Sequence, residues 1–79
     1  MEEIVPDAEL DCVGLFCPMP IMKTKQAIDN LEVGQILKVE ADDSAYEGDL
    51  KVWAKNMGHD IVKFEKEGTM MTAYIRKTK

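Results

Sequence analysis

The chain is poor in cysteine and histidine and has no long apolar run. Its 79 residues include two cysteines, Cys12 and Cys17, and a single histidine, His59. Two cysteines are too few for a disulfide scaffold or for a zinc site made of cysteines alone. No serine, histidine and acid form a hydrolase pattern, and no glycine-rich phosphate loop is present. We therefore expect no metal and assign any covalent chemistry to a thiol.

Basic residues are also in the minority. The chain has 10 lysines and arginines against 15 acidic residues, which gives a net charge of −5. Because nucleic-acid binders need a basic face, we expect no direct contact with nucleic acid. The charge fits better with a protein partner that carries a basic patch. The sequence shows no membrane span and no signal-peptide pattern, so we expect a cytoplasmic protein with free thiols.

The apolar pattern predicts one domain over residues 1–79, with 1–7 loosely ordered. Strict alternation of apolar and polar residues predicts strands, and spacing by three and four residues predicts helices. The strands are expected over 8–12, 35–41, 59–67 and 69–76, and the helices over 18–30 and 44–57. Right-handed crossovers place both helices on one face of a four-stranded mixed sheet. The predicted fold is α+β, a two-layer α/β sandwich with the order β-α-β-α-β-β.

Several local details are also predicted. Ser44 and Glu47 have capping-box spacing, with a rival helix start or a kink just after them at Gly48. Gly58 is expected to end this helix, whose buried face would carry residues Tyr46, Leu50, Trp53 and Met57. In the third strand, Val62 and Phe64 are expected to face the core. His59 is interpreted as a polar turn residue.

The most informative stretch is Cys17-Pro18-Met19-Pro20. Proline is favoured at the first helical position, so Pro18 is predicted to begin a helix with Cys17 as its N-cap. The positive end of a helix favours a thiolate, but Pro20 has no N–H to offer. We therefore expect a rigidly held sulfur with a modestly lowered pKa. Free cysteines are often buried, but the position of Cys17 in a strand-to-helix loop favours exposure.

The second cysteine, Cys12, shares a strand face with Leu10 and is predicted to be part of the core. The alternative is a resolving thiol that forms a disulfide with Cys17, which would make the protein a dithiol redox module.

Two further groups of side chains each allow two interpretations. Phe16, Met19 and Met22 could form an adaptable apolar rim that docks a partner, or be ordinary exposed apolar residues. The pair Asp42 and Asp43 could mimic a metal site, but turn carboxylates are usually solvated turn formers.

The motif residues carry a resemblance to a known family. Leu10-Asp11-x-x-Gly14-Leu15-x-Cys17-Pro18-x-Pro20 resembles the signature of the TusA/SirA-like sulfur-carrier family. The similarity continues through most of the chain, at Val33-Gly34, Ala41-Asp42-Asp43, Asp49-Leu50, Trp53, Gly58-His59 and Tyr74-Ile75-Arg76-Lys77. The fold that this resemblance implies is the same two-layer sandwich.

The resemblance implies a function for the Cys-Pro-x-Pro cysteine. Cys17 would take persulfide sulfur from a donor, such as a cysteine desulfurase or a rhodanese-like protein, and pass it to an acceptor protein. The residues that would support the motif are Asp11, Gly14, Pro18 and Pro20. The resemblance implies no resident cofactor, because the sulfur would be carried as a transient cysteine persulfide. Family members serve tRNA thiolation, molybdenum-cofactor enzymes, sulfur oxidation and selenium metabolism.

Three points stay open at this stage. We expect a monomer that acts as a protein-to-protein sulfurtransferase, although its status as an enzyme is undecided. The dithiol redox module is one alternative. An RNA- or regulator-binding domain on the same fold is another, and the net charge disfavours it.

Overall fold

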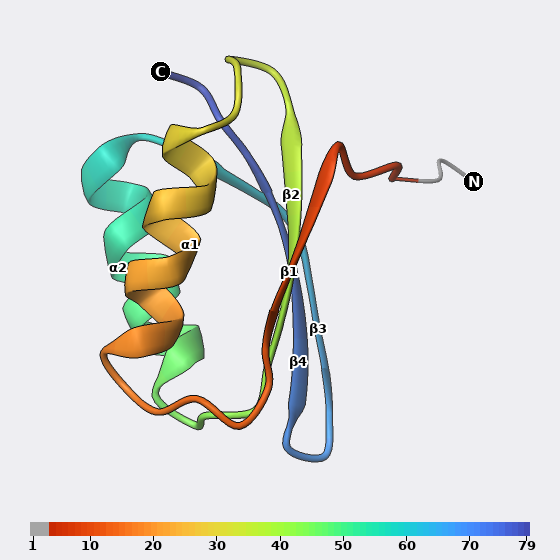
Figure 1. The fold of residues 1–79 in the computed structure, drawn as a ribbon, viewed down its shortest axis with the longest axis vertical. Helices are drawn as coiled ribbons and strands as arrows, with labels where there is room; N and C mark the ends of the chain where they lie inside the picture. Colours follow the sequence, from red (N-terminus) through yellow and green to blue (C-terminus); the bar gives the residue numbers. More distant parts are fainter. Residues whose placement is uncertain (1–3) are drawn as a thin grey trace.

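The computed structural model describes residues 4–79, and these form the two-layer sandwich that the sequence predicts. The elements are β1 (Ala8–Cys12), α1 (Met19–Asp29), β2 (Ile36–Ala41), α2 (Tyr46–Met57), β3 (Asp60–Glu67) and β4 (Met70–Arg76). Figure 1 shows both helices on one face of the sheet. Among the described helices, none has the length and apolar character needed to cross a membrane.

The predicted loose segment 1–7 lies partly outside the described residues, which begin at Ile4. Asp7 does not fit that prediction. Its amide donates to the carbonyl of Ile36 at 2.8 Å, and its carboxylate accepts the Ile36 amide at 2.8 Å. The chain is therefore attached to β2 one residue before β1 begins.

The strand order places the starts of both helices at one end of the molecule. The sheet has the order β1-β2-β4-β3, in which β1 and β2 are parallel and the other neighbours are antiparallel. Since each of the two parallel strands is followed by a helix that returns across the sheet, α1 and α2 run in the same direction (Figure 1). The β1–α1 and β2–α2 loops consequently meet at the carboxyl ends of β1 and β2.

The core follows the predicted alternation along the two central strands. Leu37, Val39 and Ala41 of β2 are buried, and so are Met71, Ala73 and Ile75 of β4. Successive side chains of a strand point to opposite faces, so one face of each strand contacts the helices. The helices contribute the fully buried side chains Ile28, Tyr46 and Leu50.

A buried hydroxyl pair connects the two helices near the start of α1. The Thr24 hydroxyl donates to the carbonyl of Pro20 at 2.8 Å, which leaves the Tyr46 hydroxyl to donate to Thr24 Oγ1, also at 2.8 Å. Burial raises the pKa of Tyr46 above its usual range. Pro20 is itself fully buried. The first turn of α1 is thus attached to α2 through three buried groups.

This pair gives a stability prediction. Tyr46→Phe should lower the free energy of unfolding by about 1 kcal/mol, because the Thr24 oxygen loses its buried donor. Urea denaturation measures the change. Tyr74→Phe is the control, since Tyr74 lies half-buried in β4 and no hydrogen bond of its hydroxyl is seen within residues 4–79. Equal losses in the two variants would contradict a specific role for the hydroxyl pair.

The prediction for Val62 is wrong, because β3 contains an irregularity. The pairing register of β3 with β4 shifts between Ile61 and Lys63, which leaves Val62 as an extra residue. After an extra residue of this kind, the side chains that follow in the strand exchange their inward and outward directions. Val62 is accordingly 39% exposed, whereas Ile61 and Phe64 pack against the core.

The start of α2 also differs from the prediction. The helix begins at Tyr46, and no side chain caps its first turn, so the capping box of Ser44 and Glu47 is absent. Gly48 lies within the helix and does not start it. Met57 is exposed, and Ala54 takes the buried position on this face. The predicted helix therefore ends where expected, starts two residues later than expected, and has a partly different inner face.

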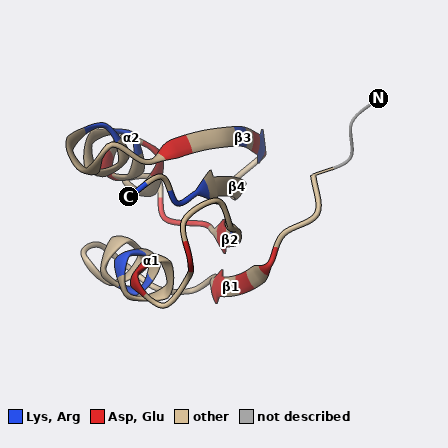
Figure 2. Ribbon diagram, turned by 90° about the horizontal axis from the view of Figure 1, so that it is seen from above, with Lys and Arg blue, Asp and Glu red and all other residues tan. Residues whose placement is uncertain are grey.

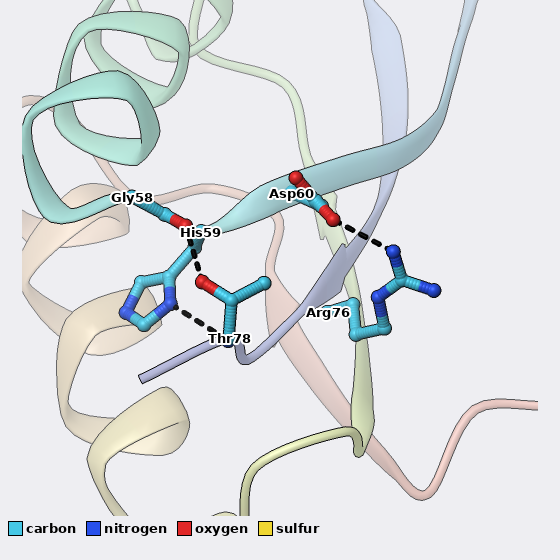
Figure 3. Close-up of polar contacts among 5 residues, drawn as sticks. All are labelled: Gly58, His59, Asp60, Arg76 and Thr78. Atoms are coloured by element: carbon cyan, nitrogen blue, oxygen red, sulfur yellow. Dashed lines mark hydrogen bonds and ion pairs between the residues drawn. The ribbon is translucent and has the colours of Figure 1, made fainter.

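The far end of α2 is joined to the C-terminal segment (Figure 3). Gly58 ends α2 as predicted, with a φ of 80°, and its carbonyl accepts a hydrogen bond from the Thr78 hydroxyl. The Thr78 amide donates to His59 Nδ1 at 3.2 Å, and burial lowers the pKa of this imidazole. Arg76 and Asp60 form an ion pair at 2.7 Å. His59 therefore lies between α2 and β3, as predicted, and is a buried structural residue there.

Candidate functional site

Cys17 lies exposed in the loop between β1 and α1. The helix begins at Met19 with Pro18 as its N-cap, one residue later than predicted, and the Cys17–Pro18 peptide is cis. The Met19 amide donates to the carbonyl of Phe16 at 2.8 Å. This N–H is consequently unavailable to the sulfur.

The motif residues Asp11 and Gly14 shape the beginning of this loop. The carboxylate of Asp11 accepts the amide of Val13 at 2.9 Å, and the amide of Leu15 donates to the carbonyl of Cys12 at 3.2 Å. Gly14 has a φ of 85°, in the left-handed region that favours glycine. The two residues therefore support the turn that leads from β1 toward the thiol.

Two carboxylates from the β2–α2 loop hold the thiol-bearing loop in place. Asp42 Oδ1 accepts the amide of Gly14 at 2.9 Å, and Asp43 Oδ2 accepts the amide of Cys17 at 2.7 Å. These contacts join residues 28 and 26 positions apart. The interpretation of Asp42 and Asp43 as solvated turn formers was therefore incomplete, because both also position the neighbouring loop.

The sulfur of Cys17 contacts a third carboxylate. Its thiol donates to Asp49 Oδ2 in the first turn of α2, with a distance of 3.3 Å between sulfur and oxygen. This hydrogen bond raises the pKa of Cys17, and the partial loss of solvent and the negative charges of Asp49 and Asp43 raise it further. The predicted lowering of the Cys17 pKa is wrong, because the carboxylates act on the thiol and the Met19 amide does not.

Sequence reasoning missed Asp49 as a neighbour of the thiol. The two residues are 32 positions apart, and no local motif links them. A usable signal was nevertheless present in the predicted topology. Two helices that follow adjacent parallel strands start at the same end of the sheet. Acidic residues in the first turn of the second helix therefore face the loop that precedes the first helix.

An open groove lies beside the sulfur, between the two helices. Its volume is about 470 Å³, and its lining includes Cys17, Pro18, Ile21, Asp49, Val52 and Trp53. Apolar side chains from both helices form most of these walls, and the polar groups are the Cys17 thiol, the Asp49 carboxylate and the Asn56 amide. A groove of this kind can receive an apolar side chain of another protein next to the reacting sulfur.

The three side chains predicted to form a docking rim lie outside this groove. Phe16, Met19 and Met22 are 77%, 42% and 47% exposed, respectively. None of them lines the groove, whose apolar wall comes instead from Pro18, from Ile21 and from residues of α2. Their role in docking stays a prediction.

Cys12 is fully buried, as predicted for a core residue. Its sulfur is 3.9 Å from the carbonyl oxygen of Pro20, and burial raises the pKa of this thiol. Both cysteines are free. A buried thiol cannot exchange with an external disulfide without movement of the core, which weighs against the dithiol alternative.

No group of three or more His, Cys, Asp or Glu side chains within the described 4–79 segment is arranged to hold a metal ion. Near the thiol, the carboxylates of Asp42, Asp43 and Asp49 accept hydrogen bonds from the protein itself. The arrangement is that of an exposed thiol whose pKa is raised by its carboxylate neighbours, and the chemistry available to it is nucleophilic sulfur exchange.

Comparison with known proteins gives a consistent assignment. The sequence pattern of the family described as sulfurtransferase TusA matches residues 8–77. YrkI of Bacillus subtilis (strain 168) is 46% identical over 71 residues, which cover 90% of this chain and 95% of YrkI. Sulfur carrier protein TusA of Pseudomonas syringae pv. syringae (strain B728a) is 39% identical over 77 residues, covering 98% of this chain and 92% of the relative.

A solved structure shows the same fold. The crystal structure of a SirA-like protein from Desulfitobacterium hafniense superimposes with a TM-score of 0.77 and 26% sequence identity. The match covers 91% of this chain and 99% of the other. Together with the exposed motif cysteine, these similarities show that the chain belongs to the TusA family of sulfurtransferases.

Proposed function

We propose that this sulfur carrier accepts the outer sulfur of a donor persulfide on Cys17 and passes it to an acceptor protein. The observation that carries the proposal is the exposure of the Cys17 sulfur beside an open groove, while the other thiol is buried. The loop that presents this sulfur is held by hydrogen bonds that its Gly14 and Cys17 amides donate to the carboxylates of Asp42 and Asp43. A partner can therefore reach one sulfur, in one defined position.

The transfer needs no external oxidant or reductant. In loading, the Cys17 thiolate attacks the outer sulfur of the donor R–S–SH, a new S–S bond forms and the donor leaves as R–S⁻. In unloading, an acceptor thiolate attacks the outer sulfur of Cys17–S–SH, and the electron pair of the broken bond returns to Cys17. Both steps resemble thiol–disulfide exchange, whose rate depends on the thiolate fraction of the attacking group.

Family membership implies protein partners on both sides of the relay. A cysteine desulfurase or a rhodanese-like protein is the donor to test first, because each forms a protein persulfide. The acceptor protein and the process that it serves are proposed only at the level of the family. The resemblance to that family includes tRNA thiolation among the processes served. A cytoplasmic location stays a prediction from the sequence.

Mass spectrometry tests the assignment of the sulfur-bearing residue. After anaerobic incubation with a cysteine desulfurase and cysteine, fragment ions should place one added sulfur on Cys17 and none on Cys12. Cys12→Ala is the matched control and should still load, because Cys12 is buried. An adduct on Cys12, or no adduct with desulfurase or rhodanese-like donors, would contradict the proposal.

A further inference from the structure

The carboxylates beside Cys17 lack a cationic partner within residues 4–79. Five ion pairs are present there, Lys38–Glu9, Lys38–Glu40, Lys51–Glu47, Lys63–Glu65 and Arg76–Asp60. None of them involves Asp43 or Asp49. The charged groups that act on the Cys17 sulfur are thus two negative side chains, one from the β2–α2 loop and one from α2.

This arrangement opposes the chemistry that a carrier performs. The thiolate is the attacking species in sulfur exchange, and a neighbouring carboxylate disfavours it while accepting a hydrogen bond from the neutral thiol. Asp49 Oδ2 lies 3.3 Å from the sulfur, in a position to bind the thiol proton. The isolated protein should therefore react slowly with electrophiles at neutral pH.

We propose that Asp49 keeps the resting Cys17 in its thiol form, and that a cationic side chain beside the reactive cysteine of a partner binds Asp49 and thereby releases the thiolate. The inference rests on the proposed sulfur-carrier function and adds to it a requirement on the partner. On release the proton passes to solvent, and the freed thiolate then forms the new S–S bond with the donor persulfide.

The groove supports this requirement on the partner. Asp49 is half-buried in the groove wall next to the apolar side chains of Val52 and Trp53. A lysine or arginine has an apolar stem and a charged end, so it can cover such a wall and still reach the carboxylate. The net charge of −5 favours the approach of a basic surface as well.

The first test measures the thiol without any partner. Asp49→Asn should be alkylated at Cys17 by iodoacetamide several-fold faster than wild type at pH 7, with its pH profile displaced to lower pH. Glu32→Gln makes the same change in net charge beyond the opposite end of α1 and should behave as wild type. An Asp49→Asn variant that folds normally and reacts no faster than wild type would overturn the proposal.

The second test supplies a cation on the attacking reagent. Cystamine, hydroxyethyl disulfide and dithiodiglycolate carry positive, zero and negative charge. Dividing each wild-type rate by the Asp49→Asn rate removes the intrinsic reactivity of the disulfide. This ratio should be highest for cystamine and lowest for dithiodiglycolate, and the differences should shrink in high salt. Equal ratios for the three reagents would reject the cation requirement.

Failure here can be separated from failure of the proposed function. Neither test uses a donor or an acceptor protein. Loading of Cys17 by a desulfurase, together with equal disulfide ratios and no faster alkylation of Asp49→Asn, would support the carrier function and reject both the role of Asp49 and the cation requirement. If the rate ratios follow the charge of the three disulfides but no donor loads sulfur on Cys17, the role of Asp49 is supported and the carrier function is rejected.

Discussion

A Cys17→Ser variant should carry no sulfur and transfer none to any acceptor. A serine hydroxyl is not ionised at neutral pH and cannot form an S–S bond, so both half-reactions lose their reacting atom. Cys17 is exposed, and its sulfur makes one hydrogen bond, to Asp49. The fold should therefore be unaffected, with a melting temperature close to that of wild type.

The measurement follows radioactive sulfur from labelled cysteine, through a desulfurase, to the carrier. Wild type and Cys12→Ala should become labelled, and dithiothreitol should remove the label, as expected of a persulfide. The Cys17→Ser protein should give no more radioactivity than a control reaction from which the carrier protein is omitted. Reductant-sensitive label on the Cys17→Ser protein would assign the sulfur to another residue and refute the central role of Cys17.

Leu50→Ala should produce the largest loss of stability that we predict, about 3 kcal/mol, from lost burial and the cavity left behind. Leu50 is fully buried in α2 against the sheet and follows Asp49 directly in the chain. Because the same turn of helix carries the carboxylate that binds the thiol, a local loosening of α2 should also raise the alkylation rate of Cys17.

Urea denaturation and iodoacetamide alkylation measure the two effects on the same samples. Val52→Ala provides the comparison, because Val52 lies two residues further along α2 and is 61% exposed. Its free energy of unfolding should change by about 0.5 kcal/mol or less. Similar losses in Leu50→Ala and Val52→Ala would show that the α2 packing described above is wrong.

The regular part of this fold could be predicted because it depends on short-range patterns. The alternation in residues 35–41 and 69–76 identified the two central strands and their buried faces, and Gly58 marked the end of α2. Val62 was misplaced because one extra residue in β3 shifts the register, and an insertion of this kind leaves no mark on composition.

The candidate site was predicted only in part. The exposure of Cys17 and the burial of Cys12 follow from their positions in a loop and on the inner face of a strand. The direction of the pKa shift of Cys17 was wrong, because it depends on Asp43 and Asp49. These residues reach the thiol through the packing of elements that are distant in sequence, whereas the helix-end argument considered only local neighbours.

Trp53 provides an optical readout of the groove. It is the single tryptophan of the chain and forms part of the wall beside Cys17. Its indole nitrogen is buried, and no hydrogen-bond partner is present among the described residues. All indole fluorescence of this protein therefore originates next to the reacting sulfur, and a partner without tryptophan could be titrated by the change in emission, with no attached dye.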